Sequence, residues 1–198
     1  MANKIHIQRF SCLPEPPVHE LDSDQGGKYL TDESRLQGNA TAVALPRSSE
    51  EVASVLARNR RNGTPTTVSA ARTGITAGAV PHGGVVLNLE KMDSITGIHK
   101  KDNTFYVECQ AGVTLQDVKK CVRSTTFPGA ADWSEEAQAY LEEMKGKHLF
   151  YPPDPTETTA TIGGTIACNA SGAHSFRYGP TRSYIAAIRV VLIDGTYI

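Results

Sequence analysis

The stretch from Tyr151 to Gly179, YPPDPTETTATIGGTIACNASGAHSFRYG, places the strongest constraint on how this chain can fold. Three prolines near its start are followed by five threonines, a Gly-Gly pair and the small-residue run 167–172. Bulky apolar side chains are nearly absent, so neither a core strand nor an amphipathic helix is expected. Small side chains let another group approach the backbone closely. Composition alone leaves two alternatives open, a long structural loop or the wall of a polar ligand site.

The sequence PPDPTETTATIGGTIACNASG, followed by RYG, resembles the flavin-binding segment of the FAD-linked oxidases of the p-cresol methylhydroxylase and vanillyl-alcohol oxidase type. Flavoprotein D-lactate dehydrogenases and the glycolate oxidase D subunit belong to that family. The resemblance covers about residues 32–198 and implies an α+β fold, a two-lobed FAD-binding domain in truncated form. It implies that the flavin ring and ribityl chain are lined by Pro153, Asp154, Thr158, Thr159, Thr161, Gly163 and Gly164, continued by Cys168, Asn169, Ala170, Ser171 and Gly172.

A second small-residue loop, residues 70–79, lies between two predicted strands. Successive backbone N–H groups in such a turn can bind an anion, although the same pattern fits a hairpin loop. The family has its pyrophosphate loop at this distance before the TIGG segment. The resemblance therefore implies that the diphosphate of FAD is bound by Ala70, Ala71, Arg72, Thr73, Gly74, Ile75, Gly78 and Ala79.

This loop departs from the commonest family pattern, because Ala70 and Arg72 stand where many members have glycine. Arg72 either obstructs the phosphate path or points outward and adds a positive charge, and the sequence leaves both open. We expect this charge to help neutralise the diphosphate. No histidine occurs in the loop, so the covalent histidyl–flavin link that some relatives make from it is not available.

Hydrophobic periodicity and capping residues predict the remaining elements. Strands are expected at 42–45, 66–69, 85–89, 95–99 and 105–110, and a buried strand at 185–193. Helices are expected after a capping box at Ser48 and Glu51, after Thr114, and after Ser134. The last of these falls in 127–147, which we interpret as an insertion relative to the family's usual short link.

These elements predict an irregular lead-in at 1–38, a first α/β lobe at 39–110 and a second lobe at 111–198. The first lobe carries the diphosphate loop, and the second carries the flavin-ring segment and is incomplete at its C-terminal end. Residues 22–27 faintly resemble a calcium loop, but Gly26 stands where a carboxylate or amide is needed, so no metal site is expected.

Charge and composition exclude several classes of function. Lys and Arg number 20 against 21 Asp and Glu, so the chain carries no net positive charge that would attract nucleic acid or an anionic membrane. No apolar run is long enough to span a bilayer. The four cysteines are far apart and predict reduced thiols. The N-terminus lacks a signal-peptide pattern, which predicts a cytoplasmic location and leaves peripheral membrane association open. Rossmann, P-loop and nucleophile-elbow motifs are missing from the sequence.

The resemblance implies an FAD-dependent dehydrogenase or oxidase that transfers hydride from a 2-hydroxy acid, such as D-lactate, glycolate or 2-hydroxyglutarate, to the flavin. Catalytic residues and the electron acceptor are not identified. Family members continue past this sequence into a cap domain, so we expect this chain alone to be inactive and to self-associate. Two alternatives remain, a flavin-binding subunit active only with a partner chain and a cell-wall reductase of the UDP-sugar type. The PDPTETTATIGG sequence favours the hydroxy-acid group over the reductase.

Overall fold

The computed structural model describes residues 7–21 and 27–198, and the chain forms two compact units. Unit 1 contains Met1–Lys91 and Ala187–Ile198, and unit 2 contains Met92–Ala186. The structure thus divides the chain at Lys91, whereas the sequence predicted a boundary after Gln110. The stretch 22–26, which carries most of the calcium-like pattern, lies outside the described residues.

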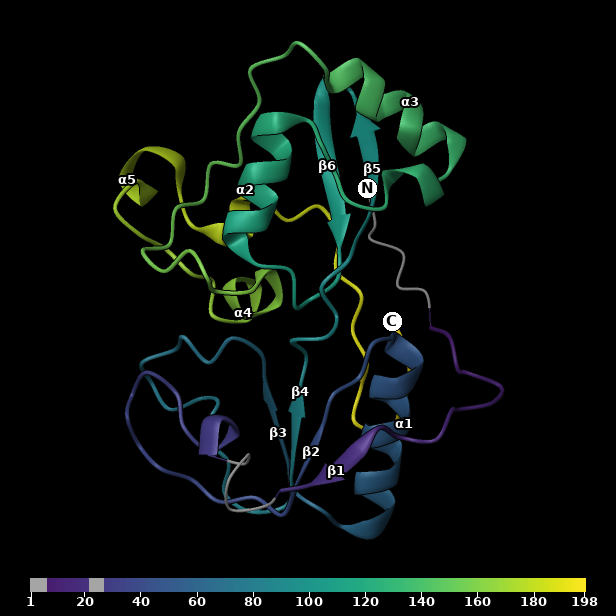
Figure 1. Ribbon diagram of the computed structural model, residues 1–198, viewed down its shortest axis with the longest axis vertical. Helices are drawn as coiled ribbons and strands as arrows, with labels where there is room; N and C mark the ends of the chain where they lie inside the picture. Colours follow the sequence, from purple (N-terminus) through teal and green to yellow (C-terminus); the bar gives the residue numbers. More distant parts are fainter. Residues whose placement is uncertain (1–6, 22–26) are drawn as a thin grey trace. The chain divides into compact units, whose positions relative to one another are not determined.

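Unit 1 contains a four-stranded sheet with the strand order β1-β2-β4-β3 (Figure 1). Its strands are β1 (Val18–Glu20), β2 (Ala42–Ala44), β3 (Thr66–Ser69) and β4 (Val85–Asn88). Strand β1 runs antiparallel to β2, while β2 and β3 both run parallel to β4. Because β3 and β4 are parallel, the 70–79 loop is part of a crossover connection, and the hairpin alternative is excluded.

Helix α1 (Ser49–Asn62) connects β2 to β3 and packs against β4. The predicted cap is confirmed, since the Ser48 hydroxyl accepts a hydrogen bond from the Glu51 amide at 3.3 Å. The helix ends at Gly63, whose φ of 65° is readily adopted only by glycine. Its buried apolar face consists of Val52, Ala53, Val55 and Leu56.

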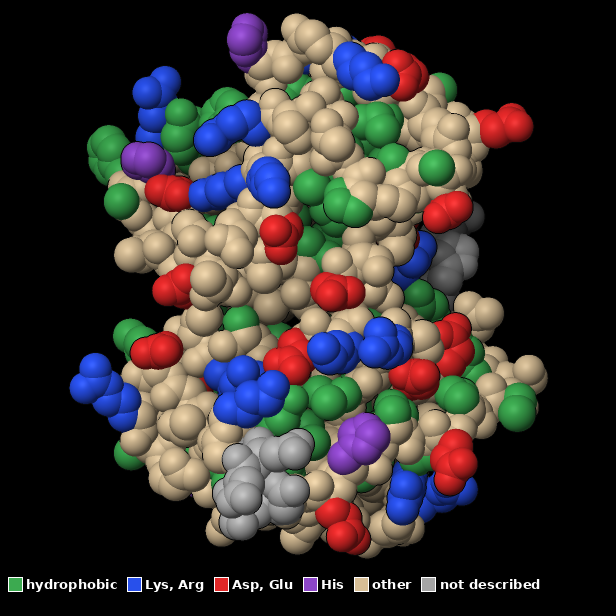
Figure 2. Space-filling view, viewed as in Figure 1, with side chains coloured by type: hydrophobic (Ala, Val, Ile, Leu, Met, Phe, Trp, Pro, Cys, Tyr) green, Lys and Arg blue, Asp and Glu red, His purple; other side chains and the backbone are tan. Residues whose placement is uncertain are grey.

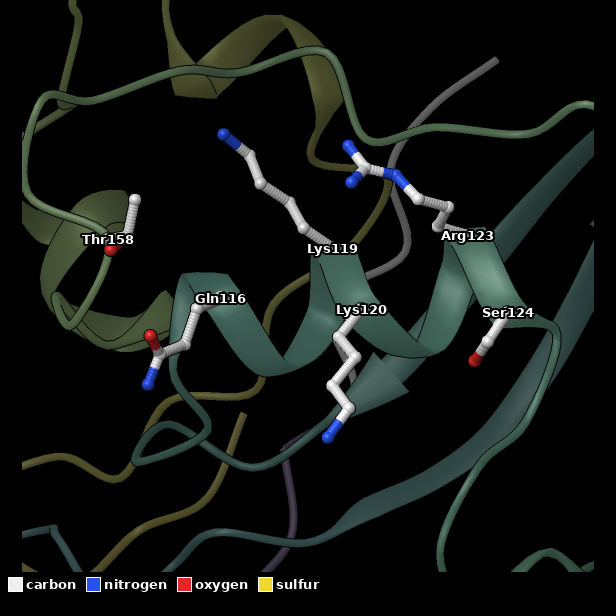
Figure 3. Close-up of a pocket in the computed structure, with 6 residues that line it drawn as sticks. All are labelled: Gln116, Lys119, Lys120, Arg123, Ser124 and Thr158. Atoms are coloured by element: carbon white, nitrogen blue, oxygen red, sulfur yellow. The ribbon is translucent and has the colours of Figure 1, made fainter.

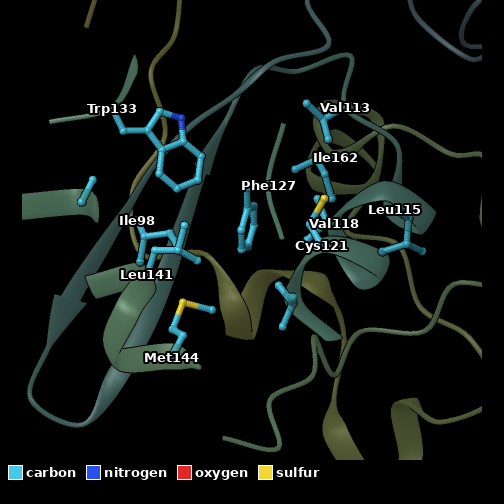
Figure 4. Close-up of a cluster of buried hydrophobic side chains, with 12 residues drawn as sticks. Ile98, Val113, Leu115, Val118, Cys121, Phe127, Trp133, Leu141, Met144 and Ile162 are labelled. Carbon is cyan, nitrogen blue, oxygen red and sulfur yellow. The ribbon is translucent and has the colours of Figure 1, made fainter. Parts of the chain in front are cut away.

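Unit 2 contains one antiparallel hairpin and four α-helices, with two 3-10 helices at Ala130–Asp132 and Thr181–Tyr184 (Figure 1). Its elements are β5 (Ile95–Lys101), β6 (Thr104–Cys109), α2 (Leu115–Ser124), α3 (Glu135–Met144), α4 (Ile162–Ala167) and α5 (Ser175–Tyr178). Thr114 and Ser134 cap α2 and α3 as predicted. The buried cluster drawn in Figure 4 joins β5, α2, α3 and α4 through Ile98, Val113, Leu115, Val118, Cys121, Val122, Phe127, Trp133, Ala137, Leu141, Met144 and Ile162.

The hairpin belongs to unit 2 because α3 packs against β5. The indole N–H of Trp133, which precedes α3, donates to the carbonyl of Ile95 at 3.2 Å. Trp133 also contacts the ring of Phe127, with centroids 5.4 Å apart. The 127–147 segment, predicted as an insertion, therefore supplies part of the core and fixes the unit boundary before β5 instead of after β6.

The expected buried strand at 185–193 is wrong. In the described chain this range pairs only through an isolated antiparallel bridge between Val191 and Tyr197, and Ile188, Leu192 and Ile193 are 57%, 40% and 54% exposed. The backbone of this segment folds back on its own turn, with the amide of Leu192 donating to Thr196 at 2.7 Å. Apolar, β-branched residues favour a strand, but a strand forms only where a neighbour pairs with it.

Candidate flavin-binding site

The 70–79 loop of unit 1 presents free backbone amides. Within the described part of the chain, no amide of residues 71–78 donates a hydrogen bond to a protein acceptor. A Cβ built on Gly74 or on Gly78 would meet nothing within 4 Å. Buried donors are normally paired, so free amides beside open space form a surface on which an anion can be hydrogen-bonded.

Residues outside the loop hold its two ends. At its start, the Asn88 side-chain amide donates to the Ser69 hydroxyl and to the Ala70 carbonyl, both at 3.0 Å. At its other end, the Asp32 carboxylate accepts a hydrogen bond from the Ala79 amide at 3.3 Å. The amide of Glu33 donates to the Arg72 carbonyl at 3.2 Å. The sequence analysis did not identify Asp32, Glu33 or Asn88, because their partners lie far away along the chain.

Burial alone would raise the pKa of Asp32, but hydrogen bonds from Ser34 and from the Ala79 amide outweigh it and hold the pKa below its ordinary value. This carboxyl group is therefore ionised at neutral pH. Its negative charge opposes the binding of an anion nearby, so the free amides of the loop supply the attraction.

The Arg72 side chain is engaged within unit 1. Its guanidinium donates to the Ala70 carbonyl at 2.7 Å and lies 3.5 Å from a carboxylate oxygen of Glu90. It also stacks over the ring of Tyr29, 5.4 Å from the centroid. The side chain is 18% exposed. The sequence left open whether Arg72 obstructs the phosphate path or points outward, and the structure pairs its guanidinium with Glu90.

The flavin-ring segment in unit 2 is attached to residues 111–116 by backbone hydrogen bonds. The amides of Leu115 and Gln116 donate to the carbonyls of Ala160 and Thr158 at 2.9 and 3.0 Å. The amide of Ile162 donates to Val113 at 2.8 Å. The segment is therefore tied along its length to the backbone that leads into α2.

Several predicted ring-lining residues hold this segment together. Thr161 is 4% exposed and caps α4 by accepting a hydrogen bond from the Gly164 amide. The sequence predicted no helix in this segment. Gly163 donates to the Ala111 carbonyl at 2.9 Å, and a Cβ on it would lie 2.7 Å from the Ala111 Cβ. A Cβ on Gly172 would lie 1.8 Å from the Asp154 carbonyl oxygen. Both glycines are therefore required by packing within unit 2.

Other contacts involve Asn169 and Ala170. The Asn169 side chain accepts a hydrogen bond from the Arg182 amide at 3.1 Å. The Ala170 carbonyl accepts one from the Thr181 hydroxyl at 2.8 Å. Pro153 is fully buried. The predicted residues that remain exposed and able to meet a ligand are Thr158, Thr159, Gly164, Cys168 and Ser171.

Asp154 is the centre of a polar network at the edge of this segment. Lys119 of α2 donates to one carboxylate oxygen at 2.6 Å, and His174 Nδ1 lies 2.9 Å from the other. The hydrogen bond from Lys119 lowers the pKa of Asp154, so the carboxylate is ionised at neutral pH. This network links α2, the ring segment and the turn before α5.

Helix α2 borders a shallow hollow beside this network. Its lining is Gln116, Lys119, Lys120, Arg123, Ser124 and Thr158. Lys119 and Arg123 leave the same side of α2 (Figure 3), and Figure 2 shows Lys and Arg side chains gathered over this helix. Thr158 is the one predicted ring-lining residue in the hollow, so the hollow meets the ring segment at its edge.

The residues of the 70–79 loop fit the diphosphate of FAD, because its amides lack protein acceptors and its glycines adjoin open space. A family model described as "FAD binding domain" matches residues 40–135 and 134–198. The chain belongs to this FAD-binding family. Its cofactor is FAD, and the two predicted segments both lie within the matched range.

Curated relatives extend this similarity to nearly the whole chain. It is 37% identical over 193 residues to a D-lactate dehydrogenase of Anaerostipes hadrus, covering 96% of this chain and 35% of the relative. It is 31% identical over 164 residues to glycolate oxidase subunit GlcD of Bacillus subtilis, covering 82% of this chain and 30% of the relative. The chain thus spans about a third of the length of these relatives.

Solved structures agree on the fold. A chitooligosaccharide oxidase matches 92% of this chain and 34% of its own, with a TM-score of 0.66 and 18% identity. A 6-hydroxy-D-nicotine oxidase from Arthrobacter nicotinovorans matches 100% of this chain and 37% of its own, with a TM-score of 0.63 and 18% identity. The predicted fold class, a two-lobed FAD-binding domain of this oxidase type, is confirmed. None of the helices in the described residues has the length and hydrophobicity needed to cross a membrane.

Proposed function

We propose that this chain supplies the FAD-binding part of a dehydrogenase that oxidises a 2-hydroxy acid of the D-lactate, glycolate or D-2-hydroxyglutarate class. The observation that carries the proposal is the 37% identity to a D-lactate dehydrogenase across 96% of the chain. A D-2-hydroxyglutarate dehydrogenase of Xanthomonas citri is 33% identical over 159 residues. These relatives act on different acids of one chemical class, so the class is proposed and the individual acid is not.

When bound, FAD supplies the hydride acceptor for this oxidation. The amides of residues 71–78 would hold the diphosphate, with Asp32 and Asn88 keeping the loop in its shape. The exposed residues of the ring segment, Thr158 and Gly164 among them, would face the flavin. We assign no general base to this chain.

A second candidate function is a flavin-binding subunit that acts only together with a partner chain. The observation that favours it is the 31% identity to a relative that is itself named a subunit, glycolate oxidase subunit GlcD of Bacillus subtilis. In both cases the chain binds FAD, and the difference lies in where the substrate pocket comes from. A cytoplasmic location remains a prediction from the sequence.

The experiment compares the 198-residue chain with the longest natural open reading frame that contains it. Each protein is loaded with FAD and assayed with D-lactate, glycolate and D-2-hydroxyglutarate, with a dye as electron acceptor. The L-enantiomers serve as matched controls. We expect turnover of a D-acid or of glycolate by the longer protein and none by the 198-residue chain.

Absence of turnover by the longer protein, restored by adding a co-expressed partner chain, would favour the subunit. Recovery of FMN alone after extraction, or of no flavin from either protein, would contradict the proposal. Equal turnover by the 198-residue chain would contradict the division of roles between this domain and the rest of the enzyme.

A further inference from the structure

Arg72 has a backbone conformation that arginine rarely adopts. Its φ is 59°, in the left-handed region, where a residue with a Cβ is about 1–2 kcal/mol less stable than in its usual conformation. Such a conformation persists only where surrounding contacts enforce it. We therefore ask which contacts hold Arg72 in this conformation.

Four groups of unit 1 enforce this conformation. The guanidinium is held by the Ala70 carbonyl at 2.7 Å, by Glu90 at 3.5 Å and by the face of Tyr29 at 5.4 Å. The Arg72 carbonyl accepts the Glu33 amide at 3.2 Å. Other residues of unit 1 thus hold both the side chain and the backbone of Arg72. Arg72 lies near the start of the row of free amides at residues 71–78.

Glu90 is itself held in place for this contact. The Tyr29 hydroxyl donates to one of its oxygens at 3.1 Å, and Lys28 lies 3.4 Å from the same oxygen. Burial alone would raise the pKa of Glu90, but Lys28, Tyr29 and Arg72 together hold it below its ordinary value. Glu90 is therefore ionised at neutral pH and compensates the charge of Arg72.

The charges of the four side chains joined by these contacts cancel. Lys28 and Arg72 contribute two positive charges, and Glu90 and Asp32 contribute two negative ones. An anion at the loop therefore meets little net charge from these four side chains. What it does meet is the row of amides at residues 71–78.

We infer that Arg72 is a positioning residue, which fixes the shape of the 70–79 loop, the proposed diphosphate site, through Glu90 and Tyr29. The inference rests on the proposed FAD site. It replaces the sequence-based expectation that Arg72 neutralises the diphosphate directly. The two roles predict opposite changes in FAD affinity for Glu90→Gln, which releases the guanidinium while preserving the size of its partner. A positioning role predicts weaker binding, and direct neutralisation of the diphosphate predicts tighter binding.

The experiment measures the dissociation constant of FAD for the flavin-free protein by fluorescence titration, at low and at high salt. Hydrogen exchange of the Ala79 and Glu33 amides, whose hydrogen bonds hold the loop in place, is followed in the same samples, together with thermal unfolding. The variants are Glu90→Gln and Arg72→Lys, which keeps the charge but loses the planar guanidinium. Lys28→Gln is the matched control, since Lys28 is 57% exposed and its removal leaves the contacts of Arg72 with Ala70, Glu90 and Tyr29 in place. Gly78→Val blocks the proposed diphosphate surface itself.

We expect Glu90→Gln and Arg72→Lys each to weaken FAD binding about tenfold, equivalent to about 1.4 kcal/mol, and to speed exchange of the Ala79 and Glu33 amides. Lys28→Gln should change the affinity less than about twofold, and the wild-type affinity should depend weakly on salt. Tighter FAD binding by Glu90→Gln, or unchanged affinity in Arg72→Lys, would overturn the positioning role. Unchanged affinity in Gly78→Val, or no FAD binding by the wild type, would instead overturn the proposed FAD site, and the inference with it.

Discussion

Two glycines that the sequence analysis assigned to FAD, Gly74 at the diphosphate and Gly163 at the ring and ribityl chain, should respond to valine in different ways. Gly74→Val adds a side chain to open space in the 70–79 loop, where a Cβ meets nothing within 4 Å. Gly163→Val adds one at a point where a Cβ would lie 2.7 Å from the Ala111 Cβ and 2.9 Å from its carbonyl oxygen. We therefore expect a loss of FAD affinity from the first substitution and a loss of stability from the second.

The sizes of the two effects follow from these contacts. At Gly163 the ring segment must move away from Ala111, which costs about 1–3 kcal/mol for overpacking and about 1 kcal/mol for the weakened backbone hydrogen bond. A total of about 3 kcal/mol lowers the Tm of a chain of this size by about 6–12 °C. At Gly74, whose φ is not positive, stability should change by about 0.5 kcal/mol or less. Loss of one charge-assisted hydrogen bond there weakens FAD binding about 10- to 100-fold.

The assay is a pair of measurements on each variant, a thermal melt of the flavin-free protein and a fluorescence titration with FAD. Alanine at each position serves as a smaller matched substitution. A Gly163→Val protein with the wild-type Tm would refute the packing argument. A Gly74→Val protein with wild-type affinity would refute the assignment of the diphosphate to this loop.

Three further predictions concern stability and association. Thr161→Ala removes the cap of α4 and should lower the free energy of unfolding by about 1 kcal/mol, measured by urea titration; an unchanged midpoint would contradict it. Because the Lys119 hydrogen bond depresses the pKa of Asp154, its contribution is complete above the unfolded pKa of about 3.9 and is lost as the pH falls through the lower folded value. Stability should therefore fall less between about pH 5 and pH 2.5 in Asp154→Asn than in the wild type, and equal slopes would count against the network. Replacing exposed Ile188 and Leu192 with serine should reduce self-association of this chain in analytical ultracentrifugation, and an unchanged sedimentation profile would show that other surfaces associate.

Local sequence signals predicted most of the regular elements. The caps at Ser48, Thr114 and Ser134 are confirmed, because capping depends on residues within one turn of the helix. Strands β2 to β6 lie where hydrophobic patterns placed them, to within a few residues at their ends. The assigned family and its cofactor also follow from a contiguous segment, since TIGG and its flanking residues are close together in the sequence.

Contacts between distant parts of the chain could not be predicted in this way. The pairing of Arg72 with Glu90 and the hydrogen bond from Ala79 to Asp32 depend on the tertiary fold. The packing of Gly163 on Ala111 likewise gave no signal in the sequence, where the glycine suggested ligand contact. The strand predicted at 185–193 is wrong for the same reason. β propensity identifies a segment suited to a strand but does not say whether a neighbouring strand pairs along its length.

The parallel crossover between β3 and β4 has a consequence for the order of folding. A hairpin loop would form together with its two strands, but the 70–79 loop takes its shape from residues far upstream: Asp32 lies 47 residues before its partner Ala79. Tyr29 and Glu90, which hold Arg72, are separated by 61 residues. Closing such long loops costs chain entropy before the contacts repay it. We therefore expect the amide row to be completed late on the folding pathway, so that flavin binds unit 1 after its sheet has assembled.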